Sequence, residues 1–216
     1  MSIMEEKVVE LIVREVMARV KEQQGGGNRQ VLCNVSARHI HLSQPHVEAL
    51  FGEGYQLTKL KDLMQPGQYA CNETVAVIGP KTTFPKVRVL GPARGDTQLE
   101  VSATDARTLG VQPMVRMSGK IEGTPGITLE GPKGRITVDK GVIVAARHIH
   151  ATPADAERLG VKDGQIVRVR KVGERAITFD DVVFRVHPSF ALEMHLDTDE
   201  ANAGSIKDGD MLEIVG

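Results

Sequence analysis

The chain has 216 residues, with 27 Lys and Arg against 28 Asp and Glu, and a formal net charge of −1 at pH 7. This balance excludes the basic surface of a nucleic-acid-binding protein and a strongly acidic tail. No apolar run reaches the roughly 20 residues of a membrane-spanning helix, and the first residues lack the apolar core of a secretory signal. Cys33 and Cys71 form neither a disulfide framework nor a CxxC pair, so we expect a reducing, cytoplasmic setting.

The N-terminal segment differs in pattern from the rest of the chain. Between Glu5 and Gln23, valine and isoleucine recur at three- and four-residue spacing among charged residues, which predicts an amphipathic helix. The sequence GGGN at 25–28 then predicts a flexible tether. Two interpretations stay open: the helix packs on its own body or on another copy, or it docks into the groove of a partner. Its apolar stripe consists of Val9, Ile12, Val13, Val16 and Val20.

After the tether, short runs alternate between apolar and polar residues and are bounded by Gly, Pro, Asp or Asn, which is typical of barrels and sandwiches. Strands are expected at 31–42, 73–79, 85–91, 97–102, 114–119, 134–139, 141–150, 165–172, 181–187, 191–197 and 210–216. Short helices are expected at 44–52, 102–110 and 152–160, where a run begins near Ser, Thr or Asp and stops at Gly.

The pentapeptide Ala-Arg-His-Ile-His occurs twice, at 37–41 and at 146–150, and it accounts for four of the seven histidines. A weaker similarity extends beyond it, because a strand, a short helix, Leu-Gly-Val and a second strand follow one another around 100–117 and around 146–169. No third copy occurs at a fixed period, which argues against a solenoid. The sequence therefore predicts a mainly β fold with two small β-barrels capped by short helices.

Each copy of the pentapeptide places two histidines on one face of a strand, because residues i and i+2 point to the same side. His39 and His41 form one pair, and His148 and His150 form the other. Two imidazoles about 7 Å apart at the backbone can converge on one zinc ion, with a carboxylate or thiolate completing the site. Duplication of the whole motif favours metal binding, while a duplicated packing motif stays open. Further candidate ligands are His46, Glu73, Glu100, His187 and His195.

Several stretches together resemble the PduL-type phosphate propanoyltransferases, the phosphotransacylases of bacterial microcompartments. They are the two ARHIH motifs, Lys61 in KLKDL, CNETV at 71–75, PKVRVLGPARGDTQLEVSATDA at 85–106 and MHLDTDEANAG at 194–204. The resemblance covers about Gln30 to the C-terminus, and the first helix with its glycine linker, 1–28, is similar to the encapsulation peptides of such enzymes. It implies a crossed topology, with 29–37 and 146–216 in one barrel and 38–145 in the other, and the active site between them.

The resemblance also implies two zinc ions per chain. The first would be held by His39, His41 and Glu100, with the coenzyme A sulfur as its fourth ligand. The second would have positions left for water or phosphate and would be held by His148, His150 and His195. Arg94, in GPARGD, would bind phosphate. The coenzyme A site would be lined by Ser36, Lys61, Arg88, Leu90, His195 and Asn202.

The implied reaction converts a short-chain acyl-CoA, propanoyl or acetyl, and phosphate into acyl phosphate and coenzyme A. Phosphate can attack the thioester directly, so no nucleophilic side chain is needed, and Cys33 and Cys71 are expected to be small apolar residues. Two alternatives stay open: a zinc-dependent hydrolase that uses water, and a structural microcompartment component with closed zinc sites. The implied partners are shell proteins, bound through the first helix in the microcompartment lumen, and further copies of the chain in a homodimer or higher oligomer.

Overall fold

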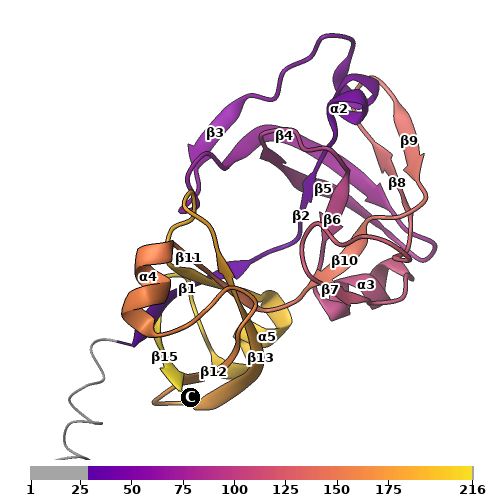
Figure 1. Ribbon diagram of the computed structural model, residues 1–216. Helices are drawn as coiled ribbons and strands as arrows, with labels where there is room; N and C mark the ends of the chain where they lie inside the picture. Colours follow the sequence, from indigo (N-terminus) through magenta and orange to yellow (C-terminus); the bar gives the residue numbers. More distant parts are fainter. Residues whose placement is uncertain (1–28, 216) are drawn as a thin grey trace, which may run out of the picture. The chain divides into compact units, whose positions relative to one another are not determined.

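The computed structural model describes residues 29–215, so the predicted N-terminal helix and tether lie outside the described residues. Within that range the chain forms fifteen strands and four short helices, which confirms the mainly β fold class (Figure 1). None of these four helices is long and apolar enough to cross a membrane. Apart from Gln30, the strand assemblies and the site described below lie in the compact unit Val31–Gly216.

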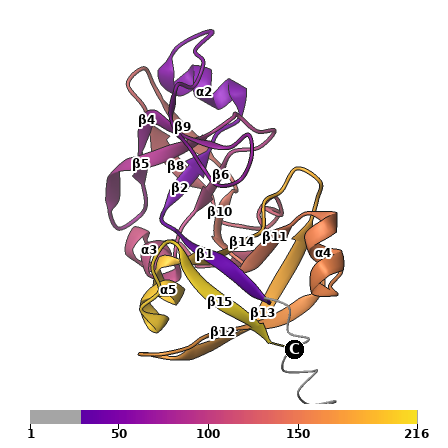
Figure 2. The same ribbon diagram turned by 90° about the vertical axis from the view of Figure 1, so that its left-hand side faces the viewer.

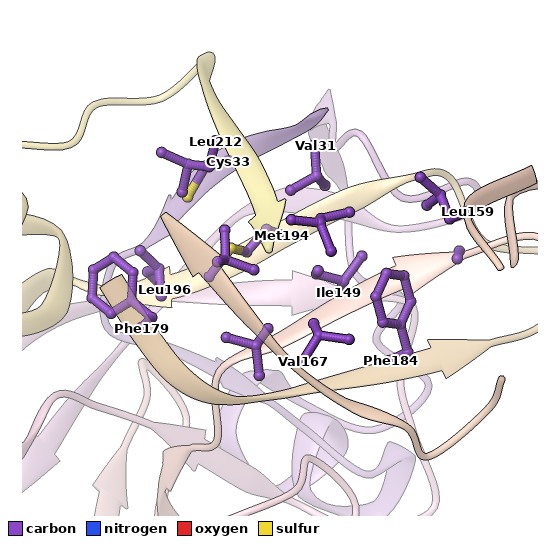
Figure 3. Close-up of a cluster of buried hydrophobic side chains, with 14 of the residues drawn as sticks. Val31, Cys33, Ile149, Leu159, Val167, Phe179, Phe184, Met194, Leu196 and Leu212 are labelled. Atoms are coloured by element: carbon purple, nitrogen blue, oxygen red, sulfur yellow. The ribbon is translucent and has the colours of Figure 1, made fainter. Parts of the chain in front are cut away.

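Six strands close into a barrel in the order β1-β14-β11-β13-β12-β15. Their bounds are Gln30–Ser36 for β1, His148–Ala151 for β11, Ile166–Lys171 for β12, Ile177–Val186 for β13, Glu193–Asp197 for β14 and Asp210–Val215 for β15. β1 pairs in parallel with β14, and Figure 2 shows it beside β15. Fully buried apolar side chains that include Ile149, Phe184 and Met194 form the core of this barrel (Figure 3).

The other strands form a nine-stranded sheet in the order β7-β10-β6-β2-β5-β4-β8-β9, with β3 paired to β4. Their bounds are His39–His41 for β2, Lys59–Asp62 for β3, Tyr69–Ile78 for β4, Thr83–Gly91 for β5, Gln98–Glu100 for β6, Val115–Arg116 for β7, Ile127–Glu130 for β8, Arg135–Val138 for β9 and Val142–Ala145 for β10. A second apolar cluster, which includes Ile40, Leu99 and Leu129, packs on this sheet. The described residues therefore have two separate cores, one for each strand assembly.

Both copies of the pentapeptide lie where the chain passes from one strand assembly to the other. The expected strand over 31–42 is interrupted, because β1 belongs to the barrel and β2 to the nine-stranded sheet. The expected strand over 141–150 is interrupted in the same way, since β10 belongs to the sheet and β11 to the barrel. Period-two alternation continues through both points and does not reveal that the pairing partners change. The division into domains at 29–37, 38–145 and 146–216 stays a prediction.

The arginine of each pentapeptide forms an ion pair that holds the connection between two strands, β1 and β2 in the first copy and β10 and β11 in the second. Arg38 pairs with Asp105, with 2.9 Å between Nη2 and Oδ1, and its guanidinium lies 4.3 Å from the ring centroid of Phe84. Arg147 pairs with Glu200 through Nε at 2.8 Å. Each acid belongs to a short helix, so both connections share an arginine held by a helical carboxylate.

The helices are α2 (Gln44–Phe51), α3 (Ala103–Leu109), α4 (Pro153–Leu159) and α5 (Thr198–Gly204). The ends expected from sequence are confirmed for α4, where Thr152 and Asp155 form a capping box and Gly160 adopts the left-handed conformation. The expected strands also lack β8, whose four residues alternate between buried and half-buried, and the expected elements lack α5 and β3. α5 buries only Ala201 and Gly204, and the four residues of β3 are exposed, so neither segment has the apolar periodicity that predicts an element.

Candidate active site

Each pair of motif histidines gains a third potential ligand from the neighbouring antiparallel strand. Glu100 on β6 lies opposite His39 on β2, and His195 on β14 lies opposite His148 on β11. Within each group, the potential ligand atoms all lie within 4.8 Å of one another. The first group is His39, His41 and Glu100, and the second is His148, His150 and His195. The structure therefore brings together all six side chains expected to bind zinc, in two groups of three.

The first histidine of each motif has its tautomer fixed by the motif itself. His39 Nδ1 lies 2.9 Å from the carbonyl oxygen of Ala37, and His148 Nδ1 lies 2.8 Å from that of Ala146. A carbonyl only accepts, so each Nδ1 carries the proton and donates it. The Nε2 lone pair of each ring is then available to a metal, with the backbone holding the ring from behind.

The second histidine of each motif has a buried nitrogen that the protein leaves unused. Nδ1 of His41 and Nδ1 of His150 have no hydrogen-bond partner among the described residues. Burial, aided by His39, lowers the pKa of His41 to about 3. Burial, aided by His148, lowers the pKa of His150 to about 2. Both rings are neutral at pH 7 and present a lone pair, so a metal ion fits these side chains and would satisfy the unused nitrogens.

The two groups lie next to each other. Glu100, His148 and His195 line one small cavity of about 20 Å³. Burial raises the pKa of Glu100, but attraction to His39, His41 and His148 outweighs it and lowers the pKa to about 2. Burial and the neighbouring His195 lower the pKa of His148 to about 4. At neutral pH the first group therefore offers an ionised carboxylate, and the second offers the neutral imidazoles of His148 and His150.

Both groups open on a larger cavity of about 920 Å³, lined by the barrel and the nine-stranded sheet. A cavity of this size suits a small organic ligand or cofactor. Arg94 lines it, as do five of the six residues expected at the coenzyme A site, namely Ser36, Lys61, Arg88, Leu90 and His195. Asn202 is exposed on α5 and is not among the residues that line this cavity, so its role stays a prediction.

A second arginine, which the sequence analysis did not single out, also lines the large cavity. Arg185 lies on β13 in register with His150 on β11. Burial lowers the pKa of Arg94, while Glu100 raises it and Arg185 lowers it. Both guanidinium groups stay charged, since their ordinary pKa lies far above neutrality. Alternation along β13 placed Arg185 on one face of the strand, but only the pairing of β13 with β11 turns that face toward the histidines.

The remaining candidate ligands lie elsewhere. His46, half-buried, has Nδ1 2.7 Å from the hydroxyl oxygen of Thr97. Glu73 accepts a hydrogen bond from the hydroxyl of Thr58 at 2.6 Å, and His187 is exposed. None of these three side chains belongs to either group of potential ligands.

The two cysteines are buried, as expected for small apolar residues. Burial, reinforced by nearby acids, raises the pKa of Cys33 to about 12, and burial likewise raises the pKa of Cys71 to about 11. Neither thiol ionises at neutral pH, and a reactive cysteine needs its thiolate.

A family model described as phosphate propanoyltransferase matches residues 32–207. The chain belongs to this family. A phosphate propanoyltransferase of Thermotoga maritima is 54% identical over 204 residues, which cover 94% of this chain and 95% of the relative. One of Sebaldella termitidis is 54% identical over 201 residues, with 93% and 94% covered. One of Clostridioides difficile is 49% identical over 210 residues, with 97% and 98% covered. The family resemblance inferred from the sequence motifs is confirmed.

Proposed function

We propose that the chain transfers a short acyl group, propanoyl or acetyl, reversibly between coenzyme A and phosphate at a site that holds two zinc ions. The observation that carries this proposal is the meeting of two three-ligand groups and two arginines at one cavity of about 920 Å³. Three protein ligands with an open position are the pattern of a catalytic zinc site, whereas a structural site is closed by four.

The two groups differ in charge, and this difference supports the binding of a different substrate at each group. Glu100 gives the first group one negative charge, and we assign the coenzyme A sulfur to that group. The second group has three imidazoles and no carboxylate among its ligands. A zinc ion bound there would keep its full positive charge, which suits a phosphate or water ligand. When bound, the two zinc ions would hold sulfur as the thiolate and stabilise the negative charge that develops on oxygen.

Two arginines supply the positive charge that would hold phosphate in the cavity. Arg94 and Arg185 line the cavity from the two strand assemblies, and a planar guanidinium donates two parallel hydrogen bonds to phosphate. Held in this way, a phosphate oxygen attacks the carbonyl carbon of the thioester. The new oxygen–carbon bond forms as the carbon–sulfur bond breaks, and sulfur leaves with the electron pair. No side-chain nucleophile takes part, which agrees with the high pKa values of both buried thiols.

The coenzyme A moiety would lie along the same cavity. Lys61 is exposed at its edge, and Arg88 Nη1 donates to the carbonyl oxygens of Cys71 and Asn72 at 2.8 and 2.9 Å, so this guanidinium is held in place. Two cations suit the 3′-phosphate and the diphosphate of coenzyme A. The rest of the proposed coenzyme A site is Ser36, Leu90, His195 and Asn202.

The proposal extends to the whole chain. Residues 1–28 would dock the enzyme to microcompartment shell proteins and retain it in the lumen, and the chain would act as a homodimer or higher oligomer. Residues 29–37 with 146–216, and 38–145, would be its two catalytic domains. The docking proposal rests on the apolar stripe and the glycine tether of the sequence, and the division into two domains rests on the family resemblance.

The experiment that tests the reaction is a thiol-release assay on the full-length chain with acetyl-CoA and propanoyl-CoA, run with and without phosphate and paired with detection of acyl phosphate. We expect thiol release only with phosphate, and one acyl phosphate for each thiol. Thiol release without phosphate would show a hydrolase. No thiol release and no affinity for coenzyme A would show a structural component. Either result would overturn the proposal.

A further inference from the structure

Two buried polar side chains outside the ligand groups lie beside the third ligand of each group. Gln98 precedes Glu100 by two residues on β6, and Glu193 precedes His195 by two residues on β14. Each therefore shares a strand face with its ligand. Each also lies opposite the second motif histidine, Gln98 opposite His41 and Glu193 opposite His150. Both are 3% exposed.

Glu193 fixes one nitrogen of His195. Its Oε2 lies 3.0 Å from Nε2 of His195, which donates to the carboxylate. Oε2 also accepts from Nε2 of Gln65, and Oε1 accepts from Nδ2 of Asn34. Both carboxylate oxygens are thus engaged with the protein, so Glu193 is not free to act as a ligand itself. With Nε2 of His195 held in this way, Nδ1 is the ring nitrogen left to face a metal.

Gln98 holds one carboxylate oxygen of Glu100 by donating a hydrogen bond to it. Its Nε2 donates to Oε1 of Glu100 at 2.6 Å, and Ser118 Oγ donates to the same oxygen at 3.0 Å. The amide is itself held, because its Oε1 accepts from the backbone N–H of Gly119 at 2.7 Å. The other carboxylate oxygen of Glu100, Oε2, lies 3.6 Å from Nε2 of His39. One oxygen is therefore committed to the protein and the other faces the ligand group.

We infer that Glu193 and Gln98 are positioning residues, each of which fixes the metal-facing atom of the third ligand in its own group. This inference rests on the proposed function. The chemistry of the pair is reciprocal: the imidazole of His195 receives an anionic acceptor, and the carboxylate of Glu100 receives an amide donor. A partner that holds a metal ligand from behind contributes about 10- to 100-fold to metal affinity.

The position of Glu193 also depends on a contact from the nine-stranded sheet. Gln65, in the connection between β3 and β4, is buried and bonds the backbone of Ala191 in both directions, with Nε2 donating at 3.1 Å and Oε1 accepting at 3.2 Å. Its amide therefore joins the nine-stranded sheet to the strand that carries His195. Gln65→Ala should weaken metal binding in the second group, and by less than loss of Glu193 itself.

The test measures the affinity for Zn²⁺ of the full-length chain by competition with a chromophoric chelator, in two single-site backgrounds. The His39→Ala background retains the second group, and the His148→Ala background retains the first. Glu193→Gln should weaken zinc binding by about 10- to 100-fold in the His39→Ala background and leave it unchanged in the His148→Ala background. Gln98→Met should give the opposite pattern.

Glu73→Gln is the matched control, because Glu73 is a buried, hydrogen-bonded carboxylate that contacts neither group. It should leave zinc affinity unchanged in both backgrounds. If the wild-type chain binds no zinc, or the two backgrounds do not retain about one equivalent each, the proposed function fails. If they do, and Glu193→Gln and Gln98→Met leave zinc affinity as it was, the positioning inference fails alone.

An effect of either variant on both groups alike would also overturn the inference, since it would show a general loss of structure. If circular dichroism shows that Glu193→Gln does not fold, Gln65→Ala tests the same carboxylate from outside the barrel. A weaker second group and an unchanged first group would then support the inference. An unchanged second group would contradict it.

Discussion

Glu100 lies directly opposite His39 across the antiparallel pair of β6 and β2, with 3.6 Å between the carboxylate Oε2 and the imidazole Nε2. The same register position opposite His148 is occupied by His195. The repeated pentapeptide therefore duplicates only two of the three potential ligands of each group, the two histidines on one strand. The partner strand completes each group with a different kind of side chain, so the two groups are alike in construction and different in charge.

This arrangement predicts two independent metal equivalents. His39→Ala and His148→Ala should each lose about one of two zinc ions per chain, because each removes one ligand of a three-ligand group. Elemental analysis of the purified variants measures this. His187→Ala is the matched control, since His187 is an exposed histidine outside both groups, and it should retain both ions. A wild-type chain without transition metal, with activity that survives chelation, would contradict the assignment.

The two arginines predict a coupled effect on phosphate. Arg94→Lys and Arg185→Lys should each raise the KM for phosphate or lower kcat by about 10- to 100-fold, because a lost charged hydrogen bond costs about 1.5–3 kcal/mol. Coenzyme A binding should change little. If both guanidiniums hold one phosphate, the double variant should lose less than the product of the single losses. Steady-state kinetics with varied phosphate measures this, with exposed Arg168→Lys as the control. Normal phosphate kinetics for Arg94→Lys would remove that residue from the site.

The buried histidines predict that the metal-free chain loses stability in mild acid. The folded pKa values of His41, His148 and His150 are about 3, 4 and 2, below the ordinary value of 6.5. Between those values and pH 6.5 the unfolded chain binds more protons than the folded chain, so stability is present above about pH 6.5 and is lost as pH falls. Each group contributes up to about 1.4 kcal/mol per pH unit.

Urea unfolding of chelator-treated protein at pH 7.5 and pH 5.0 checks this expectation. These pH values lie above the range in which most carboxylates titrate, so histidines dominate the difference. His150→Ala should reduce the pH dependence, because the variant lacks one of the depressed groups. Equal stability at both pH values would show that these rings are not held in the neutral state.

The sequence alone was sufficient for the ligands that alternate along one strand and insufficient for those that depend on pairing between strands. The spacing of His39 and His41 predicts that they project together. Their connection to Glu100 required the register of β2 and β6, and period-two alternation did not reveal where β1 ends and the chain changes sheets. The residue pattern offered Glu100 and His195 only among five candidate ligands, and the family resemblance selected these two. It did not supply Glu193, which accepts hydrogen bonds from Asn34 and Gln65, two residues distant from it in sequence.

We expect the predicted N-terminal helix to have a function separable from catalysis. Deletion of residues 1–27 should leave zinc content and acyl transfer nearly unchanged, because no proposed ligand lies there. The same deletion should reduce self-association and abolish co-localisation of a fused reporter with microcompartment shells. Val13→Asp should act like the deletion, since a charge in the middle of an apolar stripe cannot be buried without a partner. Entry of the truncated enzyme into shells would contradict the docking interpretation.

Acyl transfer to phosphate should depend on metal held by both pentapeptide motifs. The most direct test of this dependence returns zinc stepwise to the metal-free, full-length chain and follows phosphate-dependent formation of acyl phosphate from propanoyl-CoA. We predict no product without zinc, full activity at about two equivalents per chain, and no recovery at any zinc concentration for His148→Ala. Acyl phosphate formation by the metal-free chain at the rate of the untreated enzyme would show that the metal is not required.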